Sequence, residues 1–484
     1  MPSLRRASTS TTALALVLGV VITIGITLRP ARPPIARAAE PGSPDVIVIV
    51  TDDQRLDTRR YMPRTKKWLG SVFVKAFASN PSCCPSRVSM FTGSYSHTNT
   101  VWSNGGGDPG TIRHDFGGWQ RYEALELDRS SIALAMQRAG YRTGHFGKFL
   151  NVFDARTFAE LPVGWDAFSA FAVGDEFPDG PQRPYYEYSL AGIGDDGGYA
   201  IETYGDEPRD HSTRVLTKKA ISFIESTRDR PLFLHLAYPT PHARHGSRKP
   251  VPLRKDLDRR VQPPDLSPAI NEADVSDKPS FIRSRDRVPA RKIERWRLAV
   301  ARSIIGLDRK IDAVLSAQAK RDPGLRNTFV MLISDNGHLY GDHRFFGKGV
   351  PYEGAIRIPL LVHWDRLPEG QVETIVANVD VAPTIADVAG IEFDAPDGRS
   401  ILSSRRRFVL LEGDGKRDAN CGIRTDTRKY LKYATGEEEF YNLARDPYEL
   451  RNNPDAAGAE ELHELAAPLC AANLPPGWPR SVEY

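Results

Sequence analysis

Cysteine is scarce in this sequence, which has four in 484 residues: Cys83, Cys84, Cys421 and Cys470. So few thiols, spaced so unevenly, exclude a disulfide-stapled scaffold and a four-thiolate zinc site. An excess of one charge is also missing, because 65 Lys and Arg face 61 Asp and Glu and leave a formal charge of +4. There is no uninterrupted basic block, zinc-finger spacing or aromatic RNA-binding signature either, and this argues against a nucleic-acid binder.

The overall composition is that of an ordinary globular chain. Hydrophobic residues make up 40% of it and charged residues 26%, and this excludes a mostly disordered, collagenous or multi-span membrane protein. At about 150 residues per domain, the length allows roughly three domains. One large α/β unit with a smaller companion fits equally well.

The pattern of the N-terminus is typical of a secretory signal. Arg5-Arg6 precede a mostly apolar, uncharged run over residues 13–28, and a Pro-rich spacer then leads to Ala36-Arg37-Ala38. The apolar run is shorter than the roughly 20 residues of a membrane span. This favours a signal peptide over residues 1–38, cleaved near Ala38, over an uncleaved anchor. We therefore expect an exported protein, secreted or associated with the cell envelope.

Short apolar strands alternate with amphipathic helical patterns along the chain. Strands are expected at Asp45–Thr51, Pro231–Tyr238, Thr328–Ser334 and Ile358–His363, and helices from Ser130 or Ser131 to Gly140, at Arg214–Ile224 and at Trp296–Leu315. Such alternation predicts an α/β fold with a mostly parallel sheet flanked by helices. In a sheet of this kind, ligands bind beyond the carboxyl ends of the strands.

Two polar stretches interrupt this alternation, and the character of the chain changes near its end. Residues 174–210 and 244–291 are expected to be long surface loops near the mouth of a site, or solvated insertions without contact to a ligand. After Asp397-Gly398, short strands at 407–411 and 429–433 and a polar helical tail follow. They predict a smaller C-terminal α+β subdomain.

The most specific motif is Cys83-Cys84-Pro85-Ser86-Arg87, followed by Thr92-Gly93. It resembles the signature of the type I, formylglycine-dependent sulfatases, in which the first cysteine of CxPxR is oxidised to formylglycine. The resemblance extends from about Pro44 to Asn453. It implies an alkaline-phosphatase-like fold, with a sulfatase catalytic domain over 39–398 and a C-terminal subdomain over 399–484. The alternative is a pair of inert, buried structural cysteines.

On this resemblance, Cys83 is the precursor of the nucleophile, and a formylglycine-generating enzyme acts on the chain during its biosynthesis. Acidic pairs follow two of the expected strands, and the resemblance implies that together with residue 83 they bind one divalent cation: Asp52, Asp53, Asp335 and Asn336. Oxygen ligands favour calcium or magnesium over zinc, and the resemblance favours calcium. Each pair alone is also compatible with a helix cap or a turn.

Four further residues match catalytic positions of the family: Arg87, Lys148, His242 and Lys348. The resemblance implies that the two lysines hold the sulfate, that His242 protonates the leaving oxygen and that Arg87 and the cation polarise the attacking hydroxyl of hydrated formylglycine. A lone lysine or histidine is more often a surface group without a chemical role. Here each stands at a strand end where the matching residue of the family stands.

The sequence departs from the family pattern at Leu150, where many sulfatases carry a histidine that contacts the formylglycine. The base that removes the second hydroxyl proton is therefore left open, with His145 and His338 as candidates. The run GKFLN, which ends at Asn151, and residues 271–279 (NEADVSDKP) instead resemble the N-acetylglucosamine-6-sulfatase branch. A carbohydrate sulfate ester is accordingly the expected substrate.

Two other functions compete with this hypothesis. One is a phosphoester or phosphonate hydrolase of the same superfamily, and the other is a secreted anion- or sugar-binding protein whose Cys83 is never converted. A binding protein has no use for a leaving-group acid such as His242, which favours an enzyme. In an oxidising compartment Cys421 and Cys470 could form a disulfide.

Overall fold

The computed structural model describes residues 42–105, 117–172, 184–194, 196–244, 249–413 and 419–472, together with 474 and 478. The predicted signal peptide, residues 1–38, lies outside this part of the chain. The same holds for residues 173–183 and 245–248 within the two polar stretches. In the part that is described, no helix has the length and apolar character needed to cross a membrane.

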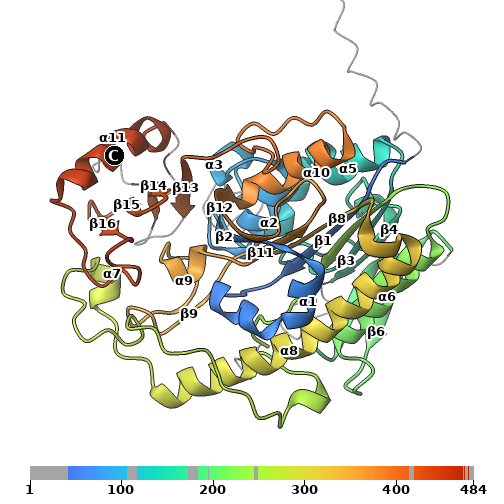
Figure 1. Ribbon diagram of the computed structural model, residues 1–484, viewed down its shortest axis with the longest axis horizontal. Helices are drawn as coiled ribbons and strands as arrows, with labels where there is room; N and C mark the ends of the chain where they lie inside the picture. Colours follow the sequence, from blue (N-terminus) through green and yellow to red (C-terminus); the bar gives the residue numbers. More distant parts are fainter. Residues whose placement is uncertain are drawn as a thin grey trace, which may run out of the picture. The chain divides into compact units, whose positions relative to one another are not determined.

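A ten-stranded sheet forms the centre of the fold (Figure 1). From one edge to the other its strands are β12 (Gly370–Ala377), β2 (Ser71–Phe77), β11 (Leu360–His363), β8 (Thr328–Ser334), β1 (Asp45–Thr51), β7 (Leu232–Ala237), β3 (Arg142–Gly147), β4 (Ala167–Phe171), β5 (Tyr188–Ile193) and β6 (Tyr199–Tyr204). The five central strands from β8 to β4 run parallel to one another. The predicted mostly parallel α/β sheet is thus confirmed.

Both faces of the sheet are covered by helices, and the central strand β1 shows why. Its residues alternate between two hydrophobic clusters, with Val46, Val48 and Val50 in one and Ile47 and Ile49 in the other. The valine side packs against α2 (Cys83–Thr92), α5 (Ile132–Arg138) and α10 (Val381–Ala389), and the isoleucine side against α6 (Ser212–Ser226) and α8 (Ala290–Arg321). A strand buried on both faces reads as a continuous apolar run, which is what the sequence shows.

Shorter elements connect these layers. They are α1 (Pro63–Trp68), α3 (Ser96–Asn99), α4 (Gly118–Ala124), α7 (Ser280–Arg283), α9 (Glu353–Ile356), β9 (Leu339–Tyr340), β10 (Phe346–Gly347) and the 3₁₀ helices η1 (Leu56–Tyr61), η2 (Leu127–Ser130), η3 (Phe158–Glu160), η4 (Arg254–Asp256), η5 (Pro323–Leu325) and η6 (Asn378–Asp380). Helix α5 begins at Ser131, whose side chain accepts the N–H of Leu134. The chain leaves this helix at Gly140, which has φ of 92° and so adopts a left-handed conformation that glycine tolerates.

The structure differs from the expected elements in several places. Strands β2, β3 and β4 of the large sheet are not among the strands expected from the sequence. Within the first polar stretch, β5 and β6 form an antiparallel hairpin and not a loop. Strand β6 is largely exposed and therefore lacks the apolar pattern of a buried strand. At the other side of the sheet, β11 runs antiparallel between β2 and β8. The connections of a strand determine whether it runs parallel or antiparallel to its neighbours. Its amino-acid composition therefore does not predict its direction.

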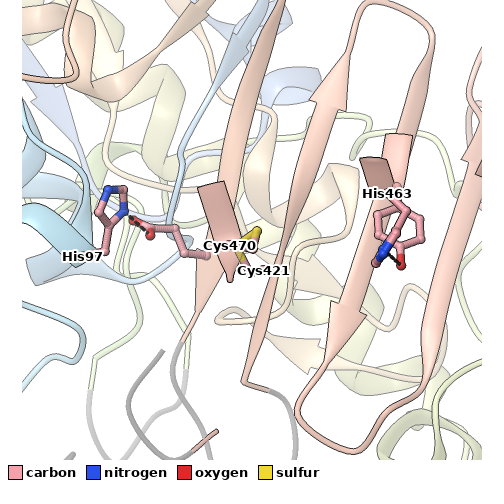
Figure 2. Close-up of a disulfide and its surroundings, with 6 residues drawn as sticks. His97, Cys421, His463 and Cys470 are labelled. Carbon is pink, nitrogen blue, oxygen red and sulfur yellow. Dashed lines mark hydrogen bonds and ion pairs between the residues drawn. A yellow bond between two sulfur atoms is a disulfide. The ribbon is translucent and has the colours of Figure 1, made fainter. Parts of the chain in front are cut away.

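A separate four-stranded antiparallel sheet follows the large one. It consists of β13 (Phe408–Gly413), β14 (Asn420–Thr425), β15 (Arg428–Tyr433) and β16 (Glu438–Asn442), with α11 (Ala457–Cys470) packed against β14 and β15. Figure 2 shows the disulfide that joins Cys421 of β14 to Cys470 at the end of α11, with Cα atoms 5.8 Å apart. The pairing that the sequence left open is present, and it fixes the helical tail to the sheet.

A hydrogen-bonded carboxylate connects this smaller sheet to the helices beside the large one. Glu412, in β13, accepts the backbone N–H of Ser96 at 2.7 Å through Oε1, and its Oε2 lies 2.7 Å from Nδ1 of His97. Figure 2 draws His97, with the dashed line that marks this interaction, near the disulfide. The start of α3 is therefore held by a residue of the C-terminal sheet.

Candidate active site

Two pairs of oxygen-bearing side chains leave the sheet side by side at the ends of neighbouring parallel strands. Strands β1 and β8 pair in register to their last residues, so Asp52-Asp53 and Asp335-Asn336 emerge at the same edge. Asn336 Nδ2 donates a hydrogen bond to Asp53 Oδ1 at 2.6 Å, and the backbone N–H of Asp53 donates to Asp335 Oδ1 at 3.1 Å. Strand register thus brings together side chains that are far apart in the sequence.

Cys83, the first residue of α2, lies directly above these carboxylates. Its thiol donates to Asp52 Oδ1 at 3.5 Å. The ammonium group of Lys148 is 3.1 Å from the sulfur and 2.6 Å from Asp52 Oδ2, and that of Lys348 is 2.6 Å from the sulfur and in close contact with Asp53. The side chain at position 83 therefore lies between two positive charges.

Arg87 supports this arrangement from one helical turn further along α2. Its Nε donates to Asp335 Oδ2 at 2.9 Å and its Nη1 donates to the backbone carbonyl of Lys148 at 2.6 Å. The guanidinium is fully buried, and Nη2 has no hydrogen-bond partner among the described residues, with Asp52 at 3.8 Å. Arg87 thus connects the ends of β3 and β8 and holds their site residues in place.

His242 enters the site from the segment after β7. Its Nδ1 lies 2.8 Å from the carbonyl oxygen of Ala243, and its Nε2 is 3.7 Å from Asp53 Oδ2. Because a carbonyl oxygen only accepts, Nδ1 carries the proton of a neutral ring, and Nε2 is the nitrogen that gains or releases one. The side chain is 30% exposed.

Three buried carboxylates and three cationic side chains balance each other at this site. Burial alone would raise the pKa of Asp52, but the positive charges around it, with Lys148 the strongest, hold that pKa well below its usual range. Burial, and next the charge of Asp52, raises the pKa of Asp335. The same two causes raise the pKa of the Cys83 thiol, so an unconverted Cys83 stays protonated and is a weak nucleophile.

The donor set fits a hard divalent cation. One ligand atom from each of Asp52, Asp53, Cys83 and His242 lies within 4.8 Å of the others, and the amide oxygen of Asn336 is beside them. Carboxylate and amide oxygens are the ligands that calcium and magnesium prefer. The residues predicted for a metal site are therefore brought together. In this structure the Lys348 ammonium group neutralises Asp53.

A family model described as Sulfatase matches residues 44–391. The chain belongs to the sulfatase family. It is 29% identical over 79% of its length to "Extracellular sulfatase SULF-1 homolog" of Drosophila melanogaster, and 26% identical over 78% of its length to human N-acetylglucosamine-6-sulfatase, of which it covers 69%. It covers only 34% of the Drosophila relative, so that protein extends far beyond the shared region.

The fold of this sulfatase matches that of a protein solved in complex with its substrate D-glucosamine-2-N,6-O-disulfate. The TM-score is 0.69, the alignment covers 88% of this chain and 97% of the other, and the sequences are 20% identical. At that identity the likeness establishes the fold alone. The predicted family and fold class are confirmed.

The cleft of this sulfatase has a volume of about 480 Å³, and Asp52, Lys148 and His242 are among the residues that line it. The lining also includes residues that the sequence motifs did not single out, chiefly Trp296 of α8 and Phe346 of β10. They belong to no motif, and an aromatic residue on a helix or strand is usually expected in the core. Only the tertiary structure shows that they border the cleft.

His145 and His338, the two candidates for the base that removes the second hydroxyl proton, differ in position. His338 lines the cleft, stacks on Trp296 with ring centroids 4.7 Å apart, and has a pKa that burial lowers to about 4. His145 is fully buried, with Nδ1 2.9 Å from Nδ1 of His235, and burial lowers the pKa of both rings. Among the described residues that line the cleft, His145 is absent. Leu150 belongs to the hydrophobic core.

Two further observations concern residues near the motif. Asn104 Oδ1 accepts the backbone N–H of Cys84 at 2.8 Å, and the N–H of Asn151 donates to the Cys84 sulfur at 3.0 Å. Cys84 therefore fixes the start of α2 in the structure.

None of residues 271–279, which resemble the N-acetylglucosamine-6-sulfatase branch, is among the described residues that line the cleft. Lys278 in this segment instead bonds to the Leu450 carbonyl oxygen.

Proposed function

We propose that this chain is a sulfuric ester hydrolase that cleaves a sulfate monoester of an amino sugar, with a formylglycine made from Cys83. The position of Cys83 between the ammonium groups of Lys148 and Lys348, at 3.1 and 2.6 Å, carries this proposal. Fixed positive charges beside a nucleophile stabilise the negative charge that develops on a transferring sulfuryl group. Membership of the sulfatase family supports it as well.

Asp52, Asp53, Asp335 and Asn336 are the residues proposed to hold one divalent cation together with residue 83, most naturally calcium, with magnesium as the alternative. Formylglycine, installed by a formylglycine-generating enzyme, would supply a hydroxyl nucleophile, and a bound cation would supply the positive charge that polarises it. A cation held by these residues would supply the positive charge that Lys348 now supplies to Asp53. Lys348 would then be free to bind an anionic ester.

The side chains of this sulfatase have separate tasks in the proposed reaction. Lys148 and Lys348 bind the nonbridging sulfate oxygens, and Arg87 keeps Asp335 and the backbone of Lys148 in position through its two hydrogen bonds. His242 donates a proton from Nε2 to the leaving sugar oxygen, because its Nδ1 is already committed to the Ala243 carbonyl. The buried His145 has no task in this scheme.

The proposed substrate class rests on the relatives. Human N-acetylglucosamine-6-sulfatase and the protein solved with a glucosamine disulfate both bear names that point to sulfated amino sugars. The aromatic wall of the cleft, with Trp296 and Phe346, suits the apolar face of a sugar ring. Export through the predicted signal peptide agrees with the extracellular relative from Drosophila.

The decisive experiment converts Cys83 to Ala in protein produced with a formylglycine-generating enzyme. We expect kcat/KM for N-acetylglucosamine 6-sulfate to fall by about 10³-fold or more, because the nucleophile is lost. Cys84→Ala is the matched control, a neighbouring buried thiol outside the proposed chemistry, and should stay within about tenfold of the wild type. Peptide mass analysis across position 83 should show an aldehyde oxygen in place of sulfur in the wild type.

Three results would contradict the proposal. Undiminished turnover by Cys83→Ala would remove the nucleophile assignment. Faster hydrolysis of the 6-phosphate than of the 6-sulfate would identify a phosphoester hydrolase. An intact cysteine at position 83, with sugar binding but no turnover, would identify a binding protein.

A further inference from the structure

A second and larger cavity, of about 680 Å³, opens beside the catalytic cleft. Among the described residues, the two share no lining residue, although both border the segments that follow β1 and β8. The second cavity is bounded by η1, α1 and α9 and by the loop 447–449 after β16. Its wall therefore combines the segments that follow β1 and β8 with the segment that follows the C-terminal sheet.

The carboxylates that line this cavity are already paired with basic side chains. The ion pairs are Asp342 with Arg55 at 2.8 Å, Asp57 with Arg55 at 3.4 Å, Glu353 with Arg424 at 3.0 Å, and Glu449 with Lys429. Arg424 and Lys429 belong to the C-terminal sheet and lie outside the lining. Little negative charge thus remains to neutralise other cations in the cavity.

Three lining cations, Arg59, Lys66 and Arg357, form no ion pair with any carboxylate of the described residues. Arg59 Nη1 is buried and has no hydrogen-bond partner in the same part of the chain. Arg357 is held in place because its Nε and Nη2 donate to the Val74 carbonyl oxygen at 3.0 and 2.6 Å. Burial, and next the charge of Arg357, lowers the pKa of Arg59.

We propose that this cavity binds an anionic group, a sulfate or a carboxylate, carried on the glycan at a sugar unit other than the one that is cleaved. Guanidinium groups match the planar or tetrahedral oxygens of such groups, and an acceptor between Arg59 and Arg357 relieves their repulsion and satisfies the buried N–H. The exposed ring of Tyr448 at the cavity gives a sugar an apolar surface.

A free inorganic anion has the same oxygen chemistry, but the cavity favours a group attached to a sugar. Its volume of about 680 Å³ exceeds that of the catalytic cleft, about 480 Å³, and is far more than a single sulfate ion requires. The identification of a glycan rests on the proposed function. The binding measurement below does not depend on turnover, so the two proposals can fail separately.

The test measures binding by titration calorimetry with the full chain carrying Cys83→Ala, which prevents turnover. The probes are a size-defined sulfated amino-sugar tetrasaccharide, N-acetylglucosamine 6-sulfate and inorganic sulfate. Lys66→Glu and Lys67→Glu form a matched pair, because both lysines are exposed on α1 and only Lys66 lines the cavity. Arg59→Gln tests the buried guanidinium, with circular dichroism to verify its fold.

We expect Lys66→Glu and Arg59→Gln each to weaken tetrasaccharide binding by about tenfold, as for the loss of a charge-assisted contact. Lys67→Glu should change the dissociation constant of the tetrasaccharide by less than about twofold. Lys66→Glu and Arg59→Gln should change the dissociation constant of N-acetylglucosamine 6-sulfate by less than about twofold, because this monosaccharide is too short to occupy both sites. Equal effects of Lys66→Glu and Lys67→Glu would overturn the proposal. The proposal would also be overturned if Arg59→Gln weakened the binding of inorganic sulfate but not that of the tetrasaccharide. That result would identify a site for free anions only.

Discussion

At the scale of single residues, the surroundings of Cys83 have opposing effects on its chemistry. Two ammonium groups favour a thiolate, whereas burial and the charge of Asp52 favour the neutral thiol, and the neutral thiol prevails because the pKa is raised. The unconverted side chain is therefore a poor nucleophile in an otherwise well-charged site. This agrees with the proposal that the residue acts only after its conversion to formylglycine.

His242 offers a direct test of leaving-group protonation. Replacing it with Ala should lower kcat/KM by about 10²-fold for sugar sulfates, whose alkoxide leaves poorly, and by much less for an aryl sulfate with an acidic phenol. Rates for a series of aryl sulfates of graded phenol pKa would measure this difference. An equal loss on all substrates would contradict the acid role.

Which residues of the site could be predicted depends on whether they belong to a motif. Cys83 and Arg87 share one, and Asp52 follows a recognisable buried strand, so the sequence indicated them. Trp296 and Asn104 could not be found in this way, because their positions in the site arise from the packing of α8 and of the loop before α4. An aromatic side chain on a helix usually packs in the core, and an asparagine in a loop usually stabilises a turn. Neither residue type therefore indicates a functional site from the sequence alone.

At the scale of elements, the parallel pairing of β1 and β8 accounts for most of the site geometry. These buried strands were predicted with their observed bounds, because both are continuous β-branched and apolar runs. The edge strands were not: β6 is mostly exposed, and β12 begins with polar residues. Edge strands bury less, so their sequences carry less of the pattern that reveals a strand.

The contact between α3 and β13 predicts a pH-dependent stability. Burial alone would lower the pKa of His97, but its hydrogen bond and charge interaction with Glu412 raise it above 6.5. A raised pKa in the folded state stabilises the protein fully below about pH 6.5, and this contribution is lost as the pH rises through the higher value. His97→Gln should therefore lower the free energy of unfolding by about 1 kcal/mol at about pH 5.

At a pH above the raised pKa the same substitution should cost much less, since the stabilisation by protonated His97 is then lost. Urea unfolding at the two pH values measures the difference. Glu412→Gln is the control, because it leaves His97 in place without the charge that raises its pKa. A pH-independent effect of His97→Gln would contradict the assignment.

At the scale of the whole molecule, the site draws its residues from segments that only the complete fold assembles. The acidic pairs come from two strands, Cys83 from the start of a helix, and Lys348 from the segment after β10. A cation bound at this point therefore links distant parts of the chain. It also relieves the repulsion between buried carboxylates, so it should stabilise the folded state as a whole.

Calcium should accordingly raise the thermal unfolding midpoint of chelator-treated protein. Ligand at 100 times its Kd adds about 2.7 kcal/mol to the stability of a single-site protein. Differential scanning calorimetry with calcium, with magnesium and with chelator measures the shift and ranks the two ions. Asp53→Asn should lose most of this shift, because it removes a charged ligand, whereas Asp258→Asn, at an exposed carboxylate outside the site, should retain it. An unchanged calcium response in Asp53→Asn would mean that the ion binds elsewhere, and a cation site at the ends of β1 and β8 would then be ruled out.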